Sequence, residues 1–374
     1  MLDLPQTRPL ALRHSILRSV REIPRDDWVR LWGDQPEGYD YFCTLEHSAL
    51  GQFKFYYICV YTADRLDLIA PVFSADFDLG IGTEGLAAKS VRWARSVCPR
   101  FLIERTLFCG SPFGEQGGLG LTNDSAQHLA LLAELEKAMA QLSGQERLRF
   151  ILFKDFPTAT LGALDALRAN GYFKGESFPN IVVRLPYATM TEYLDSLSYA
   201  CRKDLRRKVR KTLSAGKMEV RVVKNVAPII EEIYALYLQT YEAGTVRFEK
   251  LTKEYFLAVG QEMPEKTIYF LYYAGGKLAG FNLCFCHEDQ LIDKFIGFDY
   301  AISRELNLYF YSWYYNVDWC IQHRIRLYQV GQTDYEAKIR LGGEKVPLSF
   351  YAKHNHALIN AVLRAVARLL VPRG

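Results

Sequence analysis

The sharpest chemical signal in this sequence lies in a short polar segment near its C-terminal end. Residues 331–343 read Gly-Gln-Thr-Asp-Tyr-Glu-Ala-Lys-Ile-Arg-Leu-Gly-Gly and follow a predicted buried strand at 326–330. Tyr335 and Lys338 are three residues apart, so they share a side if this turn is helical. A phenol can give a proton to a leaving group, and an ammonium can polarise a carbonyl or hold a phosphate. We therefore predict catalytic roles for Asp334, Tyr335 and Lys338; the alternative is an ordinary polar surface loop.

A second candidate site is the strongly basic segment 202–211, which holds seven cationic residues and one acid. As a helix it would carry one apolar stripe, formed by Leu205, Val209 and Leu213. The cations lie either opposite this stripe (Lys203, Arg207, Lys211) or at its border, within reach of a cleft (Arg202, Arg206). Like charges this close repel one another. The segment therefore indicates an anionic partner, such as a carrier-protein helix, a CoA phosphate or a tRNA backbone, or else a face neutralised by counter-ions.

Two glycine-rich segments carry weaker signals. Gly80–Gly85 matches GxGxxG before a predicted helix, but the strands before it are joined by a short turn, which favours antiparallel pairing over a dinucleotide-binding unit. We expect a structural loop there. Residues 110–120 contain five glycines and could form a lid over a ligand or a plain loop.

Composition excludes several classes of protein. The 374 residues are 49% hydrophobic and 24% charged, which is typical of a globular protein, and the net charge of +4 is too small to indicate a nucleic-acid protein by itself. The eight cysteines are scattered without a CxxC pair, so we predict reduced thiols and no metal site. Cations interrupt the N-terminal region, and no apolar run reaches the roughly 18 residues of a membrane helix. We therefore predict no signal peptide, no membrane span and a cytoplasmic location.

The order of predicted elements is the same in both halves of the chain. Each half shows helices, an antiparallel meander, a crossover helix and a further strand. In the second half the meander strands fall at 267–273, 278–286 and 290–298, and the helix at 306–323 is apolar nearly all round, so it should be buried. We predict an α/β (α+β) fold with two mixed-sheet lobes, an N-terminal lobe at 13–186 and a catalytic lobe at 187–374.

Six short motifs follow one another along the chain: REIPRDDWVRL, LSYACRKDLRRKVRK, LYLQTYEA, LTKEYF, GGKLAGFNL and GQTDYEAKIRLGG. In this order and spacing they resemble a branch of the GNAT superfamily. That branch groups predicted N-acyltransferases with the Fem peptidyltransferases and the cellulose-biosynthesis acetyltransferase-like proteins. The resemblance covers most of the chain and implies a tandem GNAT fold of bacterial origin. It also implies donor contacts by Lys338 and by the basic segment, whose candidate donor-binding residues are Arg202, Lys203, Arg206 and Arg207.

The sequence departs from this pattern at two places. The acetyl-CoA motif of ordinary GNAT enzymes has glycines at the start of the crossover helix, whereas residues 298–307 here contain none. The backbone-amide cradle for a CoA pyrophosphate is therefore missing, and we expect acetyl-CoA to bind weakly. The family also often carries an acidic-glycine-histidine motif where Thr333-Asp334-Tyr335 stands, so the acceptor can differ.

The leading hypothesis is an N-acyltransferase without a metal or a covalent enzyme intermediate. It would move an acyl or aminoacyl group from acyl-CoA, acyl-carrier protein or aminoacyl-tRNA to an amine on a small molecule or peptide. We expect Tyr335 and Lys338 to be exposed or half-exposed, so their replacement should leave melting unchanged. The alternative is a non-catalytic GNAT-fold module that binds an anionic partner through residues 202–211. A cleft that gathers the three predicted catalytic residues would favour the enzyme.

Overall fold

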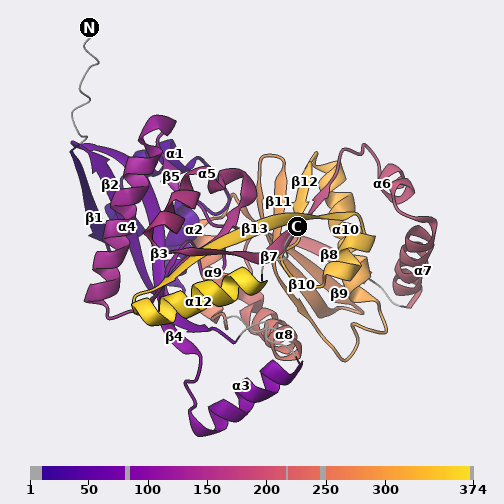
Figure 1. Ribbon diagram of the computed structural model, residues 1–374. Helices are drawn as coiled ribbons and strands as arrows, with labels where there is room; N and C mark the ends of the chain where they lie inside the picture. Colours follow the sequence, from indigo (N-terminus) through magenta and orange to yellow (C-terminus); the bar gives the residue numbers. More distant parts are fainter. Residues whose placement is uncertain (1–10, 81–84, 216–217, 245–249, 371–374) are drawn as a thin grey trace. The chain divides into compact units, whose positions relative to one another are not determined.

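The computed structural model describes residues 11–80, 85–215, 218–244 and 250–370. Its chain divides into two compact units, which are drawn in Figure 1. Unit 1 consists of residues 1–34, 51–177 and 347–374, and unit 2 consists of residues 35–50 and 178–346. The two units are therefore interleaved along the sequence, whereas the predicted lobes are continuous segments. The boundary predicted near residue 186 stays a prediction.

Unit 1 is built on a mixed sheet with the strand order β1-β2-β3-β4-β6-β13. The strands are β1 (Leu12–Leu17), β2 (Lys54–Thr62), β3 (Arg65–Asp78), β4 (Ile103–Cys109), β6 (Phe150–Pro157) and β13 (Gly343–His354), and β5 (Gly120–Leu121) pairs with β3. Neighbours are antiparallel except β4 and β6. β13 begins in unit 2 and ends in unit 1.

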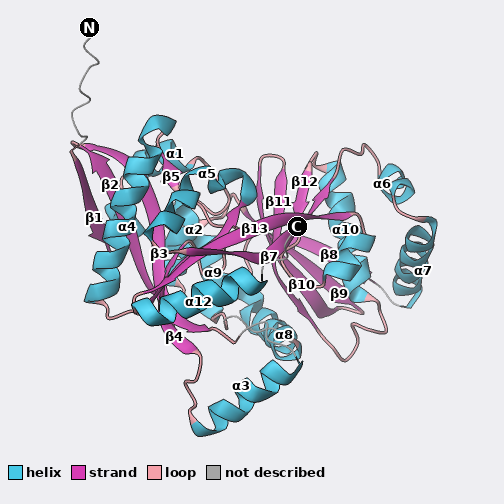
Figure 2. Ribbon diagram, in the orientation of Figure 1, coloured by secondary structure: helices cyan, strands magenta, loops and turns pink. Residues whose placement is uncertain are grey.

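Helices cover this sheet, as Figure 2 shows, in which strands are magenta and helices are cyan. They are α1 (Arg25–Trp32), α4 (His128–Gln145), α5 (Leu161–Leu164) and α12 (Ala357–Leu370), whereas α3 (Gly85–Val97) of the same unit lies away from the sheet (Figure 2). Leucines recur at helical spacing in α4, so that one face of the helix packs on β1, β2, β3 and β6 in the main core cluster of the unit. A separate cluster of aromatic residues, which includes Phe73 and Phe108, lies against α12 through Leu363.

Unit 2 repeats this plan with the strand order β7-β12-β11-β10-β9-β8. The strands are β7 (Phe173–Arg184), β8 (Met218–Val223), β9 (Thr267–Ala274), β10 (Lys277–His287), β11 (Gln290–Phe298) and β12 (Leu327–Gln329). The predicted meander forms β9, β10 and β11, and a parallel strand, β12, follows the crossover helix. Both units thus have mixed sheets with helices, which confirms the predicted fold class.

The helices of unit 2 are α2 (Tyr39–His47), α6 (Met190–Ser196), α7 (Tyr199–Ala215), α8 (Ile230–Ala243), α9 (Lys253–Glu262), α10 (Leu308–Gln322) and α11 (Tyr335–Arg340). α10 is the crossover helix and packs into the main core of the unit through residues such as Leu308, Val317 and Cys320. The prediction of a buried helix at 306–323 is confirmed. Among the described residues, no helix is both long and apolar enough to cross a lipid bilayer.

The two neighbouring parallel strands β11 and β12 pair over a short distance only. Their register joins Gln290 to Leu327 and ends where Ile292 meets Gln329. β11 then continues to Phe298, while the chain after Gln329 turns away toward α11. Beside this point β11 carries a bulge, because Cys284 faces Asp293 and the preceding Leu283 already faces Phe295. Side chains just past Ile292 therefore lie where the two strands separate.

The N-terminal segment 35–50 belongs to unit 2 because buried polar contacts tie it there. Lys294 of β11 has a side chain only 1% exposed, and its ammonium lies 2.6 Å from the Glu37 carboxylate. A buried charge without a partner is costly, so this pair fixes the segment on the unit 2 sheet. His47 of α2 also pairs with Glu262 of α9 at 2.6 Å.

Neither glycine-rich segment forms a nucleotide site in the part of the chain that the structure describes. Residues 81–84 of the GxGxxG match lie outside the described residues, but β3 and β4 on either side of it are antiparallel and so make no βαβ unit. The loop at 110–120 is packed rather than free. Ser111 and Phe113 are buried, and a Cβ on Gly117 would lie 2.2 Å from the Lys154 carbonyl oxygen. This loop is structural.

Candidate active site

The predicted catalytic segment forms a short helix, α11, directly after β12 in unit 2. Asp334 precedes its first turn with a φ of 53°, a left-handed conformation in which Asp is one of the better tolerated residues. This conformation turns the chain sharply from strand to helix. The Asp334 side chain makes no capping hydrogen bond and is exposed. Its carboxylate is therefore available to a ligand or a proton.

Tyr335 and Lys338 both contact backbone carbonyls of neighbouring strands. The Tyr335 hydroxyl donates to the Pro179 carbonyl in β7 at 3.0 Å. The Lys338 ammonium donates to the Val330 carbonyl just after β12, and the residue is only 8% exposed. The expectation that Lys338 is exposed or half-exposed is wrong, because α11 packs this side chain against the strand end. The ammonium of Lys345 lies 5.3 Å from the centre of the Tyr335 ring.

Residues at the start of α10 and along α11 line an open groove of about 570 Å³. Its lining residues are Tyr309, Phe310, Asp334, Tyr335, Glu336, Ala337 and Arg340. Of the predicted catalytic residues, Asp334 and Tyr335 line the groove, and Lys338 lies beneath it on the strand side of α11. The groove combines aromatic surface, carboxylates and one guanidinium.

Tyr309, the second residue of α10, gives this groove a buried hydroxyl. That oxygen has no contact with solvent and no hydrogen-bond partner among the described residues. Burial raises the pKa of Tyr309, and the negative charges of Asp334 and Asp293 raise it further. The phenol therefore stays protonated and can act as a hydrogen-bond donor beside Asp334. Native proteins rarely leave a buried hydroxyl without a partner unless a ligand or water supplies one.

A polar network lies where β11 and β12 separate. Asp293 accepts hydrogen bonds from the Tyr328 hydroxyl at 2.8 Å and from the Asn282 amide at 2.7 Å. Asn316 of α10 donates to the same tyrosine hydroxyl at 3.2 Å and accepts from Tyr272 at 2.6 Å. Tyr328 and Asn282 thus both donate hydrogen bonds to the Asp293 carboxylate in the core of unit 2. The negative charge of Asp293 also contributes to the raised pKa of Tyr309.

The loop between β11 and α10, where ordinary GNAT enzymes present free amides, is closed on itself. The backbone N–H groups of residues 300–303, 306–308, 310 and 311 all donate to oxygen atoms of this chain. Thr212 also donates to the Leu306 carbonyl. These amides cannot cradle a pyrophosphate without breaking their present bonds.

The basic helix α7 buries a stripe that differs from the predicted one. Cys201, Leu205, Val209 and Thr212 are buried, whereas Leu213 is 55% exposed. The prediction for Leu213 is wrong for a geometric reason. Each step of four residues turns 400°, so two such steps from Leu205 rotate the side chain about 80° away, and a step of three brings Thr212 back instead.

Some cations of α7 form ion pairs with carboxylates of this chain, and the others form none with the described residues. Arg202 lies 3.2 Å from Asp195 of α6, and Arg207 lies 2.6 Å from Asp204 one turn earlier. Lys208 also pairs with Asp204 at 2.8 Å, and these two cations hold the pKa of that carboxyl below its usual range. The other cations of the segment make no ion pair with any described residue: Lys203, Arg206, Arg210 and Lys211.

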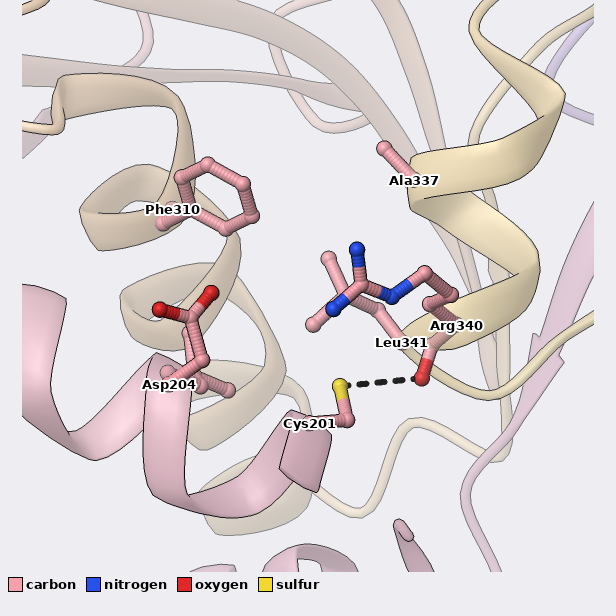
Figure 3. A pocket seen from close by; sticks show the side chains of 7 residues that line it. Cys201, Asp204, Phe310, Ala337, Arg340 and Leu341 are labelled. Atoms are coloured by element: carbon pink, nitrogen blue, oxygen red, sulfur yellow. Dashed lines mark hydrogen bonds between the residues drawn. The ribbon is translucent and has the colours of Figure 1, made fainter.

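The start of α7 adjoins α10 and α11 around a small cavity next to the groove. Figure 3 shows Asp204, Phe310 and Arg340 pointing toward the same space from these three helices. The Cys201 thiol donates to the Arg340 carbonyl at 3.1 Å, and the Lys208 ammonium lies 3.3 Å from the centre of the Phe310 ring. The start of the basic segment therefore lies close to the groove.

Two residues of this region, Tyr309 and Asp293, were not predicted from the sequence. Tyr309 lies within an aromatic run of α10 that looks like pure core. Asp293 carried a usable signal, because it follows the apolar Leu291 at strand spacing and so places a carboxylate on an inward position of β11. Strand alternation alone predicts an apolar residue there.

Comparison with known protein families gives one match over most of the chain. Residues 106–368 match the FemAB-like family, which is described as peptidoglycan biosynthesis/recognition. This segment includes β12, α11 and all of the groove residues.

Among curated proteins, the chain is similar to a protein of Mycobacterium tuberculosis named "Putative 8-amino-7-oxononanoate synthase 2" in strains H37Rv and CDC 1551. The two sequences are 25% identical over 326 residues, which cover 85% of this chain and 42% of the relative. The chain therefore spans less than half the length of the curated relatives it matches.

Solved structures with similar folds include FemX, with a TM-score of 0.57, 12% identity, and coverage of 94% of this chain and 99% of that one. A tandem GNAT protein of the clavulanic acid biosynthesis pathway has a TM-score of 0.56 and 12% identity, with coverage of 92% of this chain and 99% of that one. L-PGS from Bacillus licheniformis has a TM-score of 0.54 and 10% identity, with coverage of 90% of this chain and 98% of that one. These similarities confirm the predicted tandem GNAT fold.

Proposed function

The chain belongs to the FemAB-like family, and on this premise we propose that it transfers an acyl or aminoacyl group to the amine of a peptidoglycan-type peptide. Membership confirms the predicted relationship to the Fem peptidyltransferases and supports a transferase acting on amino groups. The donor is an ester or thioester, and the reaction takes place in the groove between α10 and α11.

The observation that carries this proposal is the Tyr309 hydroxyl. It is buried, protonated and without a described partner, and Tyr309 lines the same groove as Asp334. A neutral donor next to an acceptor is the pair that acyl transfer to an amine requires.

The chemistry assigned to these groups is a direct transfer. The neutral amine nitrogen attacks the acyl carbonyl carbon, and the carbonyl π electrons move to oxygen, where Tyr309 donates a hydrogen bond. Asp334 takes the proton that the new ammonium loses. The carbon–oxygen or carbon–sulfur bond of the donor then breaks, and the leaving group receives that proton. The predicted roles of Tyr335 and Lys338 at the leaving group remain predictions, and their present bonds to Pro179 and Val330 also position α11.

The closed loop after β11 favours a donor that is not held by its pyrophosphate. The amides of residues 300–303, 306–308, 310 and 311 are already bonded within the chain, so acetyl-CoA lacks the usual cradle. An acyl group carried on tRNA can instead be held through its phosphates by the free cations of α7, Lys203, Arg206, Arg210 and Lys211. We therefore favour aminoacyl-tRNA over acyl-CoA and acyl-carrier protein.

The test of the donor measures amide formation by mass spectrometry with a lysine-containing peptidoglycan stem peptide as acceptor. We expect a product with a mixture of charged tRNAs and little turnover with acetyl-CoA. Calorimetry should show no tight binding of acetyl-CoA. A low-micromolar dissociation constant for acetyl-CoA together with efficient acetyl transfer would overturn the donor assignment. Loss of the product when the tRNA is first deacylated is the control.

The free face of α7 should act as the docking surface for that tRNA. Replacing Arg206, Arg210 and Lys211 by Ala should weaken tRNA binding and reduce the slope of log affinity against log salt by about 0.7–0.9 per lost contact. The fold should be unaffected, since none of the three is buried. Filter binding across a salt series measures the effect.

The matched control replaces Arg202 and Arg207, which already pair with Asp195 and Asp204, and should change the salt slope less. Equal binding by the triple variant and the parent at low salt would make α7 a solvated face. Tight, salt-dependent tRNA binding without any amide product would instead support the alternative of a non-catalytic binding module.

A further inference from the structure

Helix α3 of unit 1 directs apolar side chains away from the protein. Trp93 is 73% exposed and Val97 is 77% exposed, and Phe101 just beyond the helix is 41% exposed. The helix is held from its other side, where Arg95 pairs with Asp78 and donates to the Phe101 carbonyl at 3.0 Å. A helix on a protein surface normally shows the reverse order, with its polar face outward.

The exposed face of α3 is cationic as well as apolar. Lys89, Trp93 and Val97 follow one another at steps of four residues, so they form one line along the helix. Arg92 lies next to this line, and Lys89 and Arg92 make no ion pair with a described residue. The sequence of α3 contains no Asp or Glu. Apolar anchors flanked by lysine and arginine are typical of helices that lie in the interface of an anionic membrane.

The C-terminal helix α12 of the same unit also carries apolar residues on its exposed face and a polar residue on its inward face. Its exposed residues include Leu358 at 74% and Val362 at 62%, again one turn apart. The inward side carries the polar Asn360, which donates to the Gly171 carbonyl at 2.9 Å. α12 also packs through Leu363 on the cluster that contains Phe77, at the end of the strand that leads to α3. α12 thus also presents an apolar outer face.

We propose that unit 1 binds the surface of an anionic lipid bilayer through α3, with α12 as a second contact. Charge decides between a membrane and a second copy of the chain. Two copies of α3 would bring like charges together, whereas anionic headgroups complement Lys89 and Arg92. The exposed tryptophan fits the headgroup region, where an apolar ring and a polar N–H are both satisfied. This site is separate from the groove of unit 2.

The test is co-sedimentation with vesicles of phosphatidylglycerol and phosphatidylcholine in equal parts, compared with phosphatidylcholine alone. The parent should bind the anionic vesicles, and binding should weaken as salt rises. The double variant Trp93→Ser, Val97→Ser should bind at least tenfold more weakly. Lys89→Glu combined with Arg92→Glu should remove the preference for anionic lipid. The control Val29→Ser, Val222→Ser removes exposed valines elsewhere and should bind like the parent.

Three outcomes would overturn the proposal. The first is the absence of parental binding to anionic vesicles at low salt, and the second is binding that survives both double variants. The third is a concentration-dependent dimer, seen by ultracentrifugation and lost in the Trp93, Val97 variant, without vesicle binding. Amide formation on a water-soluble acceptor should be the same in these variants and the parent, so failure here is distinguishable from failure of the groove chemistry.

Discussion

Replacement of Tyr309 by Phe is expected to lower kcat by about 10²–10³, the usual cost of losing one preorganised donor to a developing oxyanion, or roughly 3–4 kcal/mol. Only the hydroxyl is removed, and that hydroxyl has no partner among the described residues. The free energy of unfolding should therefore stay within about 0.5 kcal/mol of the parent, because no protein hydrogen bond is lost. Initial rates at saturating donor and acceptor, measured with melting on the same samples, give both numbers.

The matched control is Tyr315→Phe, which removes a phenol from the same helix at a position outside the groove lining. It should keep parental kcat. Burial and two neighbouring carboxylates raise the pKa of Tyr309, so this phenol stays a donor as pH rises through the mildly alkaline range. If the Tyr309 variant keeps the parental rate, the hydroxyl takes no part in the mechanism. Asp334 would then act without Tyr309 as the hydrogen-bond donor beside it.

The order of elements in unit 2 was predictable because local patterns and tertiary contacts agree there. The turns at Gly275-Gly276 and at residues 287–289 separate three apolar strands, and β9, β10 and β11 form as expected. Segment 35–50 was not predictable in this way. Its place in unit 2 depends on the pairing of Glu37 with Lys294, and no local pattern relates residues 257 positions apart.

The candidate site was predictable in part for the same reason. Asp334 and Tyr335 stand out because polar residues cluster after a strand, and both line the groove. Tyr309 was hidden because its neighbours in α10 are almost all aromatic or apolar, and only packing decides which phenol lacks a partner. The error at Leu213 shows the limit of spacing arguments, since a strict four-residue step drifts off the buried face within two turns.

In α11, Lys338→Met is the variant that best distinguishes a catalytic role of the side chain from a structural one. The ammonium is buried and donates to the Val330 carbonyl, so methionine should leave that carbonyl unsatisfied and cost about 1–3 kcal/mol of unfolding free energy. If Lys338 also holds the donor or the developing oxyanion, kcat/KM should fall by about 10²–10³ beyond any loss of folded protein. Rates must be measured well below the melting temperature of the variant, with the folded fraction determined by circular dichroism.

Tyr335→Phe and Lys338→Arg complete this comparison. The phenylalanine loses one hydrogen bond to the Pro179 carbonyl, worth about 1 kcal/mol, and should lose about 10²–10³ in rate only if the hydroxyl protonates the leaving group. Arginine keeps the charge of Lys338 and should recover melting more fully than rate, because its planar fork does not reproduce the ammonium geometry. Rate losses that follow the folded fraction in all three variants would make this side of α11 structural, and the chemistry would then rest with Asp334 and Tyr309.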